Sequence, residues 1–261
     1  MIATFRYAFG MQVRRRSLWI VYGLVFAVIA ARMPFWTLDM GYGEGQESWQ
    51  GMATAAGLLT SLLPLVHGCM LADRPVRDRV LRVAPILDAT PTSRTARQMG
   101  AYAGACAATA VPFAVVYFGR ALLFVVMEGQ PSAIGWAVLN FLGSIVPGLV
   151  FLGALAFAGP LLVPPMVFRV LFVAYWFWGN LIPKTMMPTI SDTIFDATGD
   201  YVRYGLLAPP TVDYGPGPPA MFDFLRPAYS PGTAVLWIGV MIALSAVMLF
   251  LLCLHASRSE S

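Results

Sequence analysis

A stretch of 50 residues, from Ile134 to Pro183, contains a single charged residue, Arg169. A helix needs about 20 apolar residues to cross the hydrocarbon core of a bilayer, so this stretch is long enough for two crossings. Of the 261 residues in the chain, 58% are hydrophobic and 11% are charged. Soluble domains usually carry about 25% charged residues. Lipid, rather than water, is therefore the expected surrounding of most of this chain.

Further apolar runs lie on either side of this stretch, and prolines and glycines mark where runs break. The break inside the long stretch is placed at Gly159, Pro160, Pro164 and Pro165. We predict an all-α polytopic membrane protein, a single transmembrane domain over residues 1–261, with six spans. Their expected ranges are 17–38, 53–72, 100–126, 134–158, 166–182 and 233–254.

Before the first span, apolar residues recur at helical spacing among arginines. Residues 1–16 are therefore predicted to form an amphipathic helix in the inner membrane surface, in contact with lipid. A basic flank that only sets topology is the alternative. The residues expected to hold this interfacial helix at the membrane are Phe5, Phe9, Arg14, Arg15 and Arg16.

The charged residues are unevenly divided between the two sides that six spans define. With both termini in the cytoplasm, twelve of the 17 basic residues lie inside and nine of the 13 acidic residues lie outside. Basic residues gather on the cytoplasmic side, so this orientation is predicted, in the plasma (inner) membrane. Residues 73–99 then form a charged cytoplasmic segment. Residues 183–231, with nine prolines and five aspartates, form a long extracytoplasmic loop.

Three charged residues fall near the outer ends of predicted spans. Arg32 is close enough to the end of the first span for its side chain to reach the membrane surface. Arg120 and Glu128 are eight residues apart at the outer end of the third span, about two helical turns. These three residues are the candidates for an outer mouth or pathway.

Two features inside the spans are interpreted mainly as packing features. Gly100 and Gly104 form a G-x-x-x-G pair at the inner end of the third span, which either lets another helix approach closely or arises by chance. His67 lies alone in the second span, and it is expected to be a hydrogen-bond donor between helices rather than a metal ligand.

The chain lacks the motifs of several kinds of catalysis. Its single lysine, Lys184, is not in a G-x-x-x-x-G-K-[ST] motif, so this chain is not a P-loop ATPase. It has no H-E-x-x-H, no G-x-S-x-G and no cysteine pair at metal-ligand spacing, so neither an enzyme nor a metal site is expected. No carboxylate falls near the middle of a predicted span, which argues against an ion-coupled carrier. The basic residues flank apolar runs, so nucleic acid is not an expected partner.

The segment at residues 73–99 is the most informative part of the sequence. Arginines mix with apolar residues over about 76–87, which indicates a short helix with a face for another protein. Thr90 is expected to cap a helix that starts at Pro91, a position where no backbone N–H is needed. That helix would run through Arg94 into the third span.

This segment resembles the corresponding part of permease subunits in the ABC-2 class of ATP-binding-cassette transporters. The similar motifs are Asp73-Arg74, Arg77-Asp78-Arg79, Ile86-Leu87 and Thr90-Pro91-Thr92-Ser93-Arg94. The order of interfacial helix, six spans, tight fourth-to-fifth turn and long outer loop is also similar, so the resemblance covers nearly the whole chain. The family often has Gly-Lys shortly after the Thr-Pro string, whereas this chain has Gln98-Met99-Gly100.

The resemblance implies the permease subunit of an exporter. Cytoplasmic ABC ATPase subunits, which would hold ATP and Mg²⁺, would dock on the 73–99 segment, and a second permease subunit, identical or a sibling, would complete the pathway. No cofactor is expected in this chain itself. A non-transporting membrane scaffold or sensor subunit that docks through the same segment is the alternative. The expected ATPase-coupling residues are Arg77, Arg79, Leu81, Arg82, Ile86, Leu87, Thr90, Pro91, Ser93 and Arg94.

Overall fold

A computed structural model describes residues 1–32, 47–76, 93–209 and 220–258, and its regular structure within these ranges is entirely helical. In lipid, a helix satisfies its backbone hydrogen bonds internally, which favours this outcome for so apolar a chain. The elements in chain order are α1 (Ile2–Val13), α2 (Arg16–Arg32), α3 (Ser48–Leu71), α6 (Arg94–Glu128), α7 (Ser132–Asn140), the π-turn η1 (Phe141–Ile145), α8 (Val146–Ala158), the 3-10 turn η2 (Gly159–Leu161), α9 (Pro165–Trp176), the π-turn η3 (Phe177–Leu181), α10 (Asp200–Gly205), the 3-10 turn η4 (Asp223–Leu225) and α11 (Pro231–Arg258).

In the described residues, four helical stretches are long and apolar enough to cross a membrane. They are Ser48–Val76, Arg94–Glu128, Ser132–Leu161 and Pro231–Leu254, and they contain the second, third, fourth and sixth predicted spans. Helices of this length and composition indicate a membrane protein. The first predicted span corresponds to α2, whose apolar part, Arg16–Ala31, is shorter. The fifth corresponds to α9 together with η3.

Prolines and glycines set several helix boundaries. α8 ends at Ala158, a 3-10 turn follows and α9 begins at Pro165, so the helix break predicted at Gly159–Pro165 is confirmed. Pro165 occupies the first helical position, where a missing N–H leaves no bond unmade. At the far end of α6, Gly129 adopts left-handed backbone with a φ of 65°, and its N–H donates to the carbonyl oxygen of Val125.

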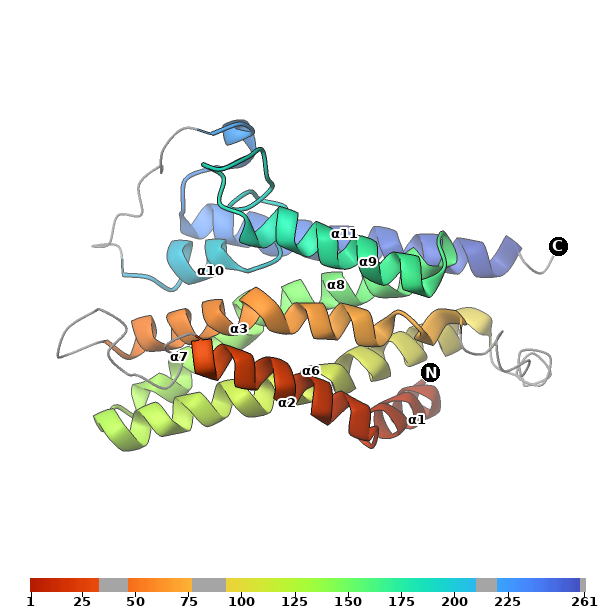
Figure 1. Cartoon of the computed structure of the whole chain (residues 1–261), viewed down its shortest axis with the longest axis horizontal. Coiled ribbons are helices and arrows are strands. Elements are labelled where there is room, and N and C mark those ends of the chain that lie inside the picture. Colours follow the sequence, from red (N-terminus) through yellow and green to blue (C-terminus); the bar gives the residue numbers. More distant parts are fainter. Residues whose placement is uncertain (33–46, 77–92, 210–219, 259–261) are drawn as a thin grey trace.

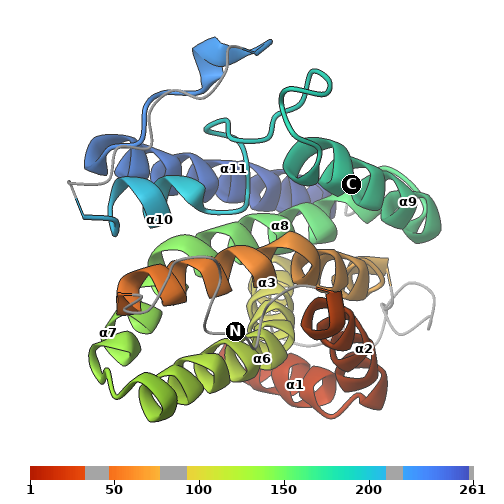
Figure 2. The ribbon, with the colours of Figure 1, turned by 60° about the vertical axis from the view of Figure 1, so that its left-hand side comes forward.

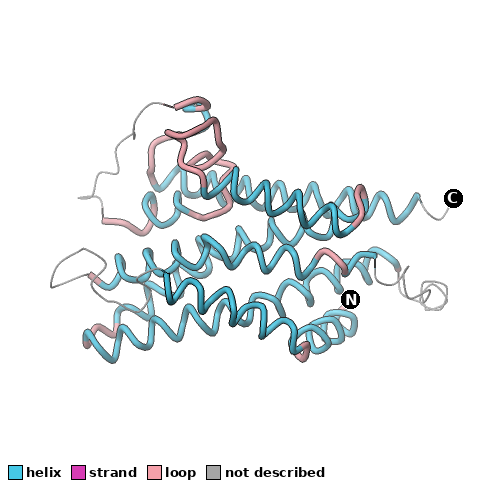
Figure 3. The backbone as a smooth tube through the Cα atoms, in the orientation of Figure 1, coloured by secondary structure: helices cyan, strands magenta, loops and turns pink. Residues whose placement is uncertain are grey.

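The long helices lie side by side, and the chain reverses direction from one to the next (Figures 1 and 2). One end of the bundle, on the right in Figure 1, holds α1 and the last turn of α11. The last turn of α3, the first turn of α6 and the α8–α9 connection lie at this end too. The segment between α9 and α11 lies at the opposite end, where Figure 3 shows most of the described loop backbone. Following the predicted orientation, we call these the inner end and the outer end.

A buried histidine joins three helices. His67 of α3 is fully buried, and its Nε2 donates a hydrogen bond to the carbonyl oxygen of Leu149 in α8 (3.1 Å). The hydroxyl of Thr109 in α6 donates to Nδ1 of the same ring (3.0 Å). Polar groups inside a membrane protein need such partners, because lipid offers none. His67 is therefore a packing contact between helices, as predicted.

Apolar side chains fill two neighbouring clusters. One lies among α2, α3, α6 and α7 and includes Leu59 and Phe113. The other lies mainly among α8, α9, α10 and α11, with a few residues of α3 and α6, and includes Trp176 and Trp237. Tyr201 of α10 belongs to the second cluster. Part of the stretch that was predicted to be an outer loop is thus folded into the helical bundle.

Candidate functional site

The inner end contains the residues that flank the undescribed part of the charged segment, residues 77–92. Just after α3, Asp73 forms an ion pair with Arg169 of α9 and accepts a 2.6 Å hydrogen bond from it. Arg169 also donates through Nε to the carbonyl oxygen of Cys69 in the last turn of α3 (3.2 Å). The first turns of α9 are thereby tied to the end of α3.

Arg74, the next residue along the chain, reaches α1. Its guanidinium donates to Oε1 of Gln12, a side chain that is fully buried. On the other side of the turn that follows α1, the indole nitrogen of Trp19 in α2 donates to the carbonyl oxygen of Val13 (2.8 Å). These contacts hold α1 between the end of α3 and the start of α2.

Gly100 and Gly104 of α6 bring α1 close to this helix. A Cβ at Gly100 would lie 2.7 Å from the carbonyl oxygen of Met1, and a Cβ at Gly104 would collide with the carbonyl oxygen of Phe5. Only residues without a Cβ permit such an approach of two backbones. The G-x-x-x-G pair is therefore a helix contact rather than a chance pattern, and its partner is α1.

Helix α6 begins at Arg94, and Ser93 is its N-cap, whose Oγ accepts a 3.2 Å hydrogen bond from the N–H of Ala96. The prediction that this helix starts at Pro91 with Thr90 as its cap was wrong, because a second residue able to cap follows three positions later. Thr90 and Pro91 themselves lie outside the described residues. The helix continues without a break into the third span, as predicted.

The remaining predicted coupling residues cannot be placed, because they fall within residues 77–92, outside the described residues. These are Arg77, Arg79, Leu81, Arg82, Ile86 and Leu87.

The predicted interfacial helix is shorter than expected. Within α1, the rings of Phe5 and Phe9 stack with their centroids 6.1 Å apart, and both side chains are half-buried. The helix ends before the arginines: Arg14 and Arg15 form the turn, and Arg16 begins α2. Arg14 and Arg16 are exposed at the inner end. Arg6 is thus the one basic residue within α1, and the other three of the N-terminal arm follow the helix.

The three predicted outer-mouth residues do not form one exposed group. Arg32 is the last residue of α2. Arg120 is only 1% exposed, and its guanidinium carbon lies 5.8 Å from the centre of the Phe124 ring in the same helix. Glu128, by contrast, is exposed at the end of α6. Arg120 therefore faces the interior of the bundle.

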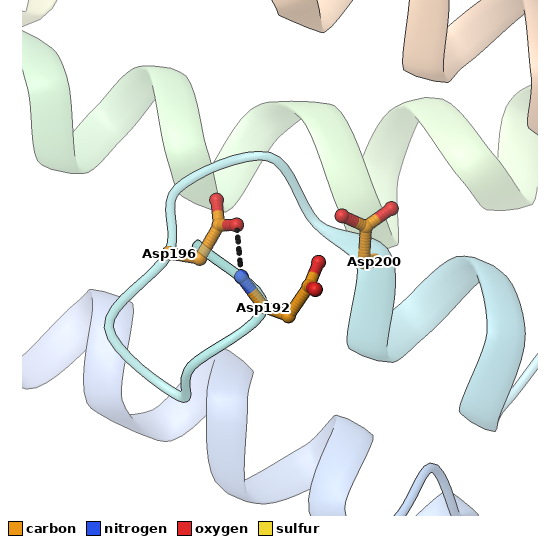
Figure 4. A group of neighbouring side chains, drawn as sticks. All are labelled: Asp192, Asp196 and Asp200. Atoms are coloured by element: carbon orange, nitrogen blue, oxygen red, sulfur yellow. Dashed lines mark hydrogen bonds between the residues drawn. The ribbon is translucent and has the colours of Figure 1, made fainter. Parts of the chain in front are cut away.

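At the outer end, polar residues gather where the chain turns back into the bundle, over residues 189–205, which we call the re-entrant segment. Asp192, Asp196 and Asp200 come together there (Figure 4), and each offers a carboxylate oxygen within 4.8 Å of the others. Asp196 is 3% exposed, and its carboxylate accepts the backbone N–H groups of Asp192 (3.0 Å) and Thr198 (2.8 Å). The Asp196 carboxylate is thus held in place by the segment's own backbone.

Two cations face these three carboxylates. Nζ of Lys184 lies 3.5 Å from Asp192, and the guanidinium of Arg203 pairs with Asp200. Burial, together with the charge of Asp200, raises the pKa of Asp196 above its usual range, so this carboxyl tends to keep its proton. Carboxylate oxygens are also the ligands that Mg²⁺ and Ca²⁺ prefer. A proton or a hard cation is thus what this group can take up.

The re-entrant segment reaches well into the bundle. Arg203, 2% exposed, donates a 3.2 Å hydrogen bond to Thr60, the thirteenth residue of the 24-residue helix α3. The burial of this polar region was not predicted from the sequence, because carboxylates were considered only within the apolar spans. A signal was present: Asp192, Asp196 and Asp200 recur every four residues within a stretch otherwise treated as a loop.

Comparisons with known proteins found no family model, no curated protein and no solved structure that matches this chain.

Proposed function

We propose that this chain is the membrane-spanning permease subunit of an ABC exporter, driven by ATP hydrolysis on separate ATPase subunits. In this proposal the chain crosses the plasma (inner) membrane six times, with α2 and the α9–η3 helix as the first and fifth spans. Both termini lie in the cytoplasm. A second copy, or a sibling subunit, completes the pathway, and residues 77–92 form the ATPase-docking part of the charged segment.

The contacts on both sides of residues 77–92 are the observation that carries this proposal. Before them, Asp73 and Arg74 bind α9 and α1. After them, Ser93 caps α6, an unbroken helix of 35 residues and about 52 Å. A partner that moves residues 77–92 would therefore act on several helices at once. Rigid-body coupling between a partner and a membrane domain needs such stiff connections.

Helix α1 extends this connected unit to the membrane surface. Because the backbone of α1 lies directly against Gly100 and Gly104, α1 moves together with α6 in this proposal. The exposed Arg14 and Arg16 after it favour anionic lipid headgroups on the cytoplasmic side. In the proposed cycle, α1 keeps the inner end of α6 at the level of the inner leaflet.

Purification in a mild detergent from the native cell, with identification of the co-purifying chains, tests this proposal. We expect a stoichiometric partner with a P-loop, and we expect deletion of residues 76–88 to remove it. Deletion of residues 210–219, on the predicted outer side, is the control and should leave the partner bound. Partners that bind no nucleotide would contradict the transporter assignment and favour a scaffold or sensor subunit. A P-loop partner retained after deletion of 76–88 would contradict docking at this segment.

A further inference from the structure

The re-entrant segment is held between two groups of helices. On one side it contacts the two helices that it connects: Asn180 of η3 accepts the N–H of Ala197 (3.1 Å), and the indole N–H of Trp237 in α11 donates to the carbonyl oxygen of Asp196 (2.7 Å). Asn180 and Trp237 belong to the helices that precede and follow the segment in the chain. The segment therefore keeps both contacts as long as the outer ends of these two helices remain together.

On its other side, the segment contacts the helix formed by α7, η1 and α8. The hydroxyl of Ser144, in the π-turn η1, donates to the carbonyl oxygen of Gly199 (3.1 Å). The carbonyl oxygen of Ala197 lies 2.5 Å from the position that a Cβ would take at Gly148. π-turns are often found at functional sites. Small residues and a locally widened helix thus make room for the backbone of the segment.

Arg203 links the same side of the segment to α3. Two of its polar partners lie in the segment itself: it pairs with Asp200 and donates to the carbonyl oxygen of Thr198 (2.8 Å). Within the described part of the chain, Thr60 is the partner that joins this guanidinium to another helix. Asp200, which carries the negative charge paired with Arg203, therefore moves together with it when the segment moves. Loss of the contact with α3 would leave no unpaired buried charge behind, which is the usual obstacle to moving a buried arginine.

We propose that the re-entrant segment is an outer closing element that alternates between a position locked on α3 and a released position, with the Arg203–Thr60 hydrogen bond as the lock. At its inner end, α3 leads into Asp73 and the charged segment, so a shift of α3 along its axis changes the distance between Thr60 and Arg203. The use of this element as the outer gate of a transport pathway rests on the proposed function. The lock itself is a property of the fold.

A purely structural role for Arg203 makes a different prediction. If Arg203 only neutralises Asp200 and supports the fold of its own segment, then Thr60 contributes nothing to the closure of that segment. Replacement of Thr60 is therefore the decisive change. Valine has nearly the shape of threonine but cannot accept the hydrogen bond from Arg203.

Hydrogen exchange followed by mass spectrometry on the intact protein in lipid nanodiscs, without nucleotide, tests the lock. We expect Thr60→Val to raise the rate of amide exchange in residues 190–205 about tenfold, which corresponds to the loss of one hydrogen bond to a charged group. The exchange rates in α6 and α8 should change little. Arg203→Met should raise it at least as much. Because both variants break one contact, the double variant should exchange like Arg203→Met alone.

Thr54→Val is the matched control, since Thr54 and Thr60 of α3 each donate to the carbonyl oxygen four residues earlier. Exchange in Thr54→Val should equal that of the wild type. If Thr60→Val also exchanges like the wild type, the lock does not exist, whatever Arg203→Met does. The measurement needs neither ATP nor a partner. A failure of the transporter proposal, seen as the absence of a P-loop partner, is therefore distinguishable from a failure of the lock.

Discussion

Arg169 donates a 2.6 Å hydrogen bond to Asp73 although 96 residues separate them, and this pair joins α9 to the end of α3. Arg169 is also the single charged residue in the 50 residues from Ile134 to Pro183. The one charge in this long apolar stretch thus has a defined partner, and that partner belongs to the Asp73-Arg74 motif at the start of the charged segment.

The strength of this ion pair can be measured with the variants Asp73→Ala, Arg169→Ala and the double variant. Half of the Asp73 side chain is exposed, so we expect a coupling free energy of only about 0.2–1 kcal/mol in thermal unfolding in nanodiscs. Arg169→Ala should cost more than Asp73→Ala, because it also removes the hydrogen bond to Cys69. Strictly additive single effects would show that the two side chains do not interact.

Gly104 should tolerate no larger residue, in contrast to an ordinary glycine in a helix. Alanine in place of glycine usually stabilises a helix by about 1 kcal/mol. A Cβ at Gly104 would instead collide with the backbone of Phe5 and lie 3.1 Å from Cβ of Ala8. We expect Gly104→Ala to destabilise the protein by about 1–3 kcal/mol, measured by thermal unfolding in nanodiscs.

Gly119→Ala is the matched control for this change, because it lies in the same helix and a Cβ there would meet no atom within 4 Å. It should be neutral or stabilising. Displacement of α1 by Gly104→Ala should also speed tryptic cleavage after Arg14, which follows α1 directly. Equal stability of the two alanine variants would mean that α1 does not pack against Gly104.

Leu81 and Leu87 are the apolar anchors expected in the docking segment, although they lie outside the described residues. Replacing both with aspartate should reduce the recovery of the ATPase partner about tenfold or more, because an apolar groove would have to bury two unpaired charges. Insertion into the membrane should be unchanged. Leu206→Asp is the control, because Leu206 is 43% exposed at the outer end and should not affect the partner. Undiminished recovery of the partner with the double aspartate variant would exclude these leucines as anchors.

The sequence was sufficient to predict features that depend on local chemistry. Apolar length predicted the four helices that are long enough to cross a membrane, and the cluster from Gly159 to Pro165 predicted the break between α8 and α9, because proline cannot continue a helical ladder. The start of α6 was harder to predict. Thr90 and Ser93 can both cap a helix, and local preference alone does not choose between them.

The polar region at the outer end could not be predicted in the same way. Its proline-rich composition is typical of a loop, and burial of Asp196 depends on Trp237 and Gly148, which are distant in sequence. The spacing of Asp192, Asp196 and Asp200 indicates that they share one face, but it does not show which distant residues bury them. Likewise, Arg120 and Glu128 differ in burial because of the helices packed around α6, and the spacing of the two residues does not contain that information.

The raised pKa of Asp196 gives the outer end a defined pH dependence. Burial is the main cause of the shift, and the charge of Asp200 adds to it. A carboxyl whose pKa is raised by folding binds its proton more tightly in the folded protein than in the unfolded chain. The contribution of Asp196 to stability is therefore fully present at low pH, and it is lost as the pH rises from about 4, the usual aspartate pKa, through the raised value.

Thermal unfolding in nanodiscs between about pH 5 and pH 9 measures this slope. Asp196→Asn should flatten it, because asparagine does not titrate, although the variant should be less stable at low pH. That loss is expected because the amide nitrogen of asparagine cannot accept the N–H of Asp192. Asp223→Asn is the control: the N–H of Ala220 lowers the pKa of this exposed carboxyl, so it is ionised across the whole range. A slope that Asp196→Asn leaves unchanged would show that Asp196 is already ionised in the folded protein and that another group causes the pH dependence.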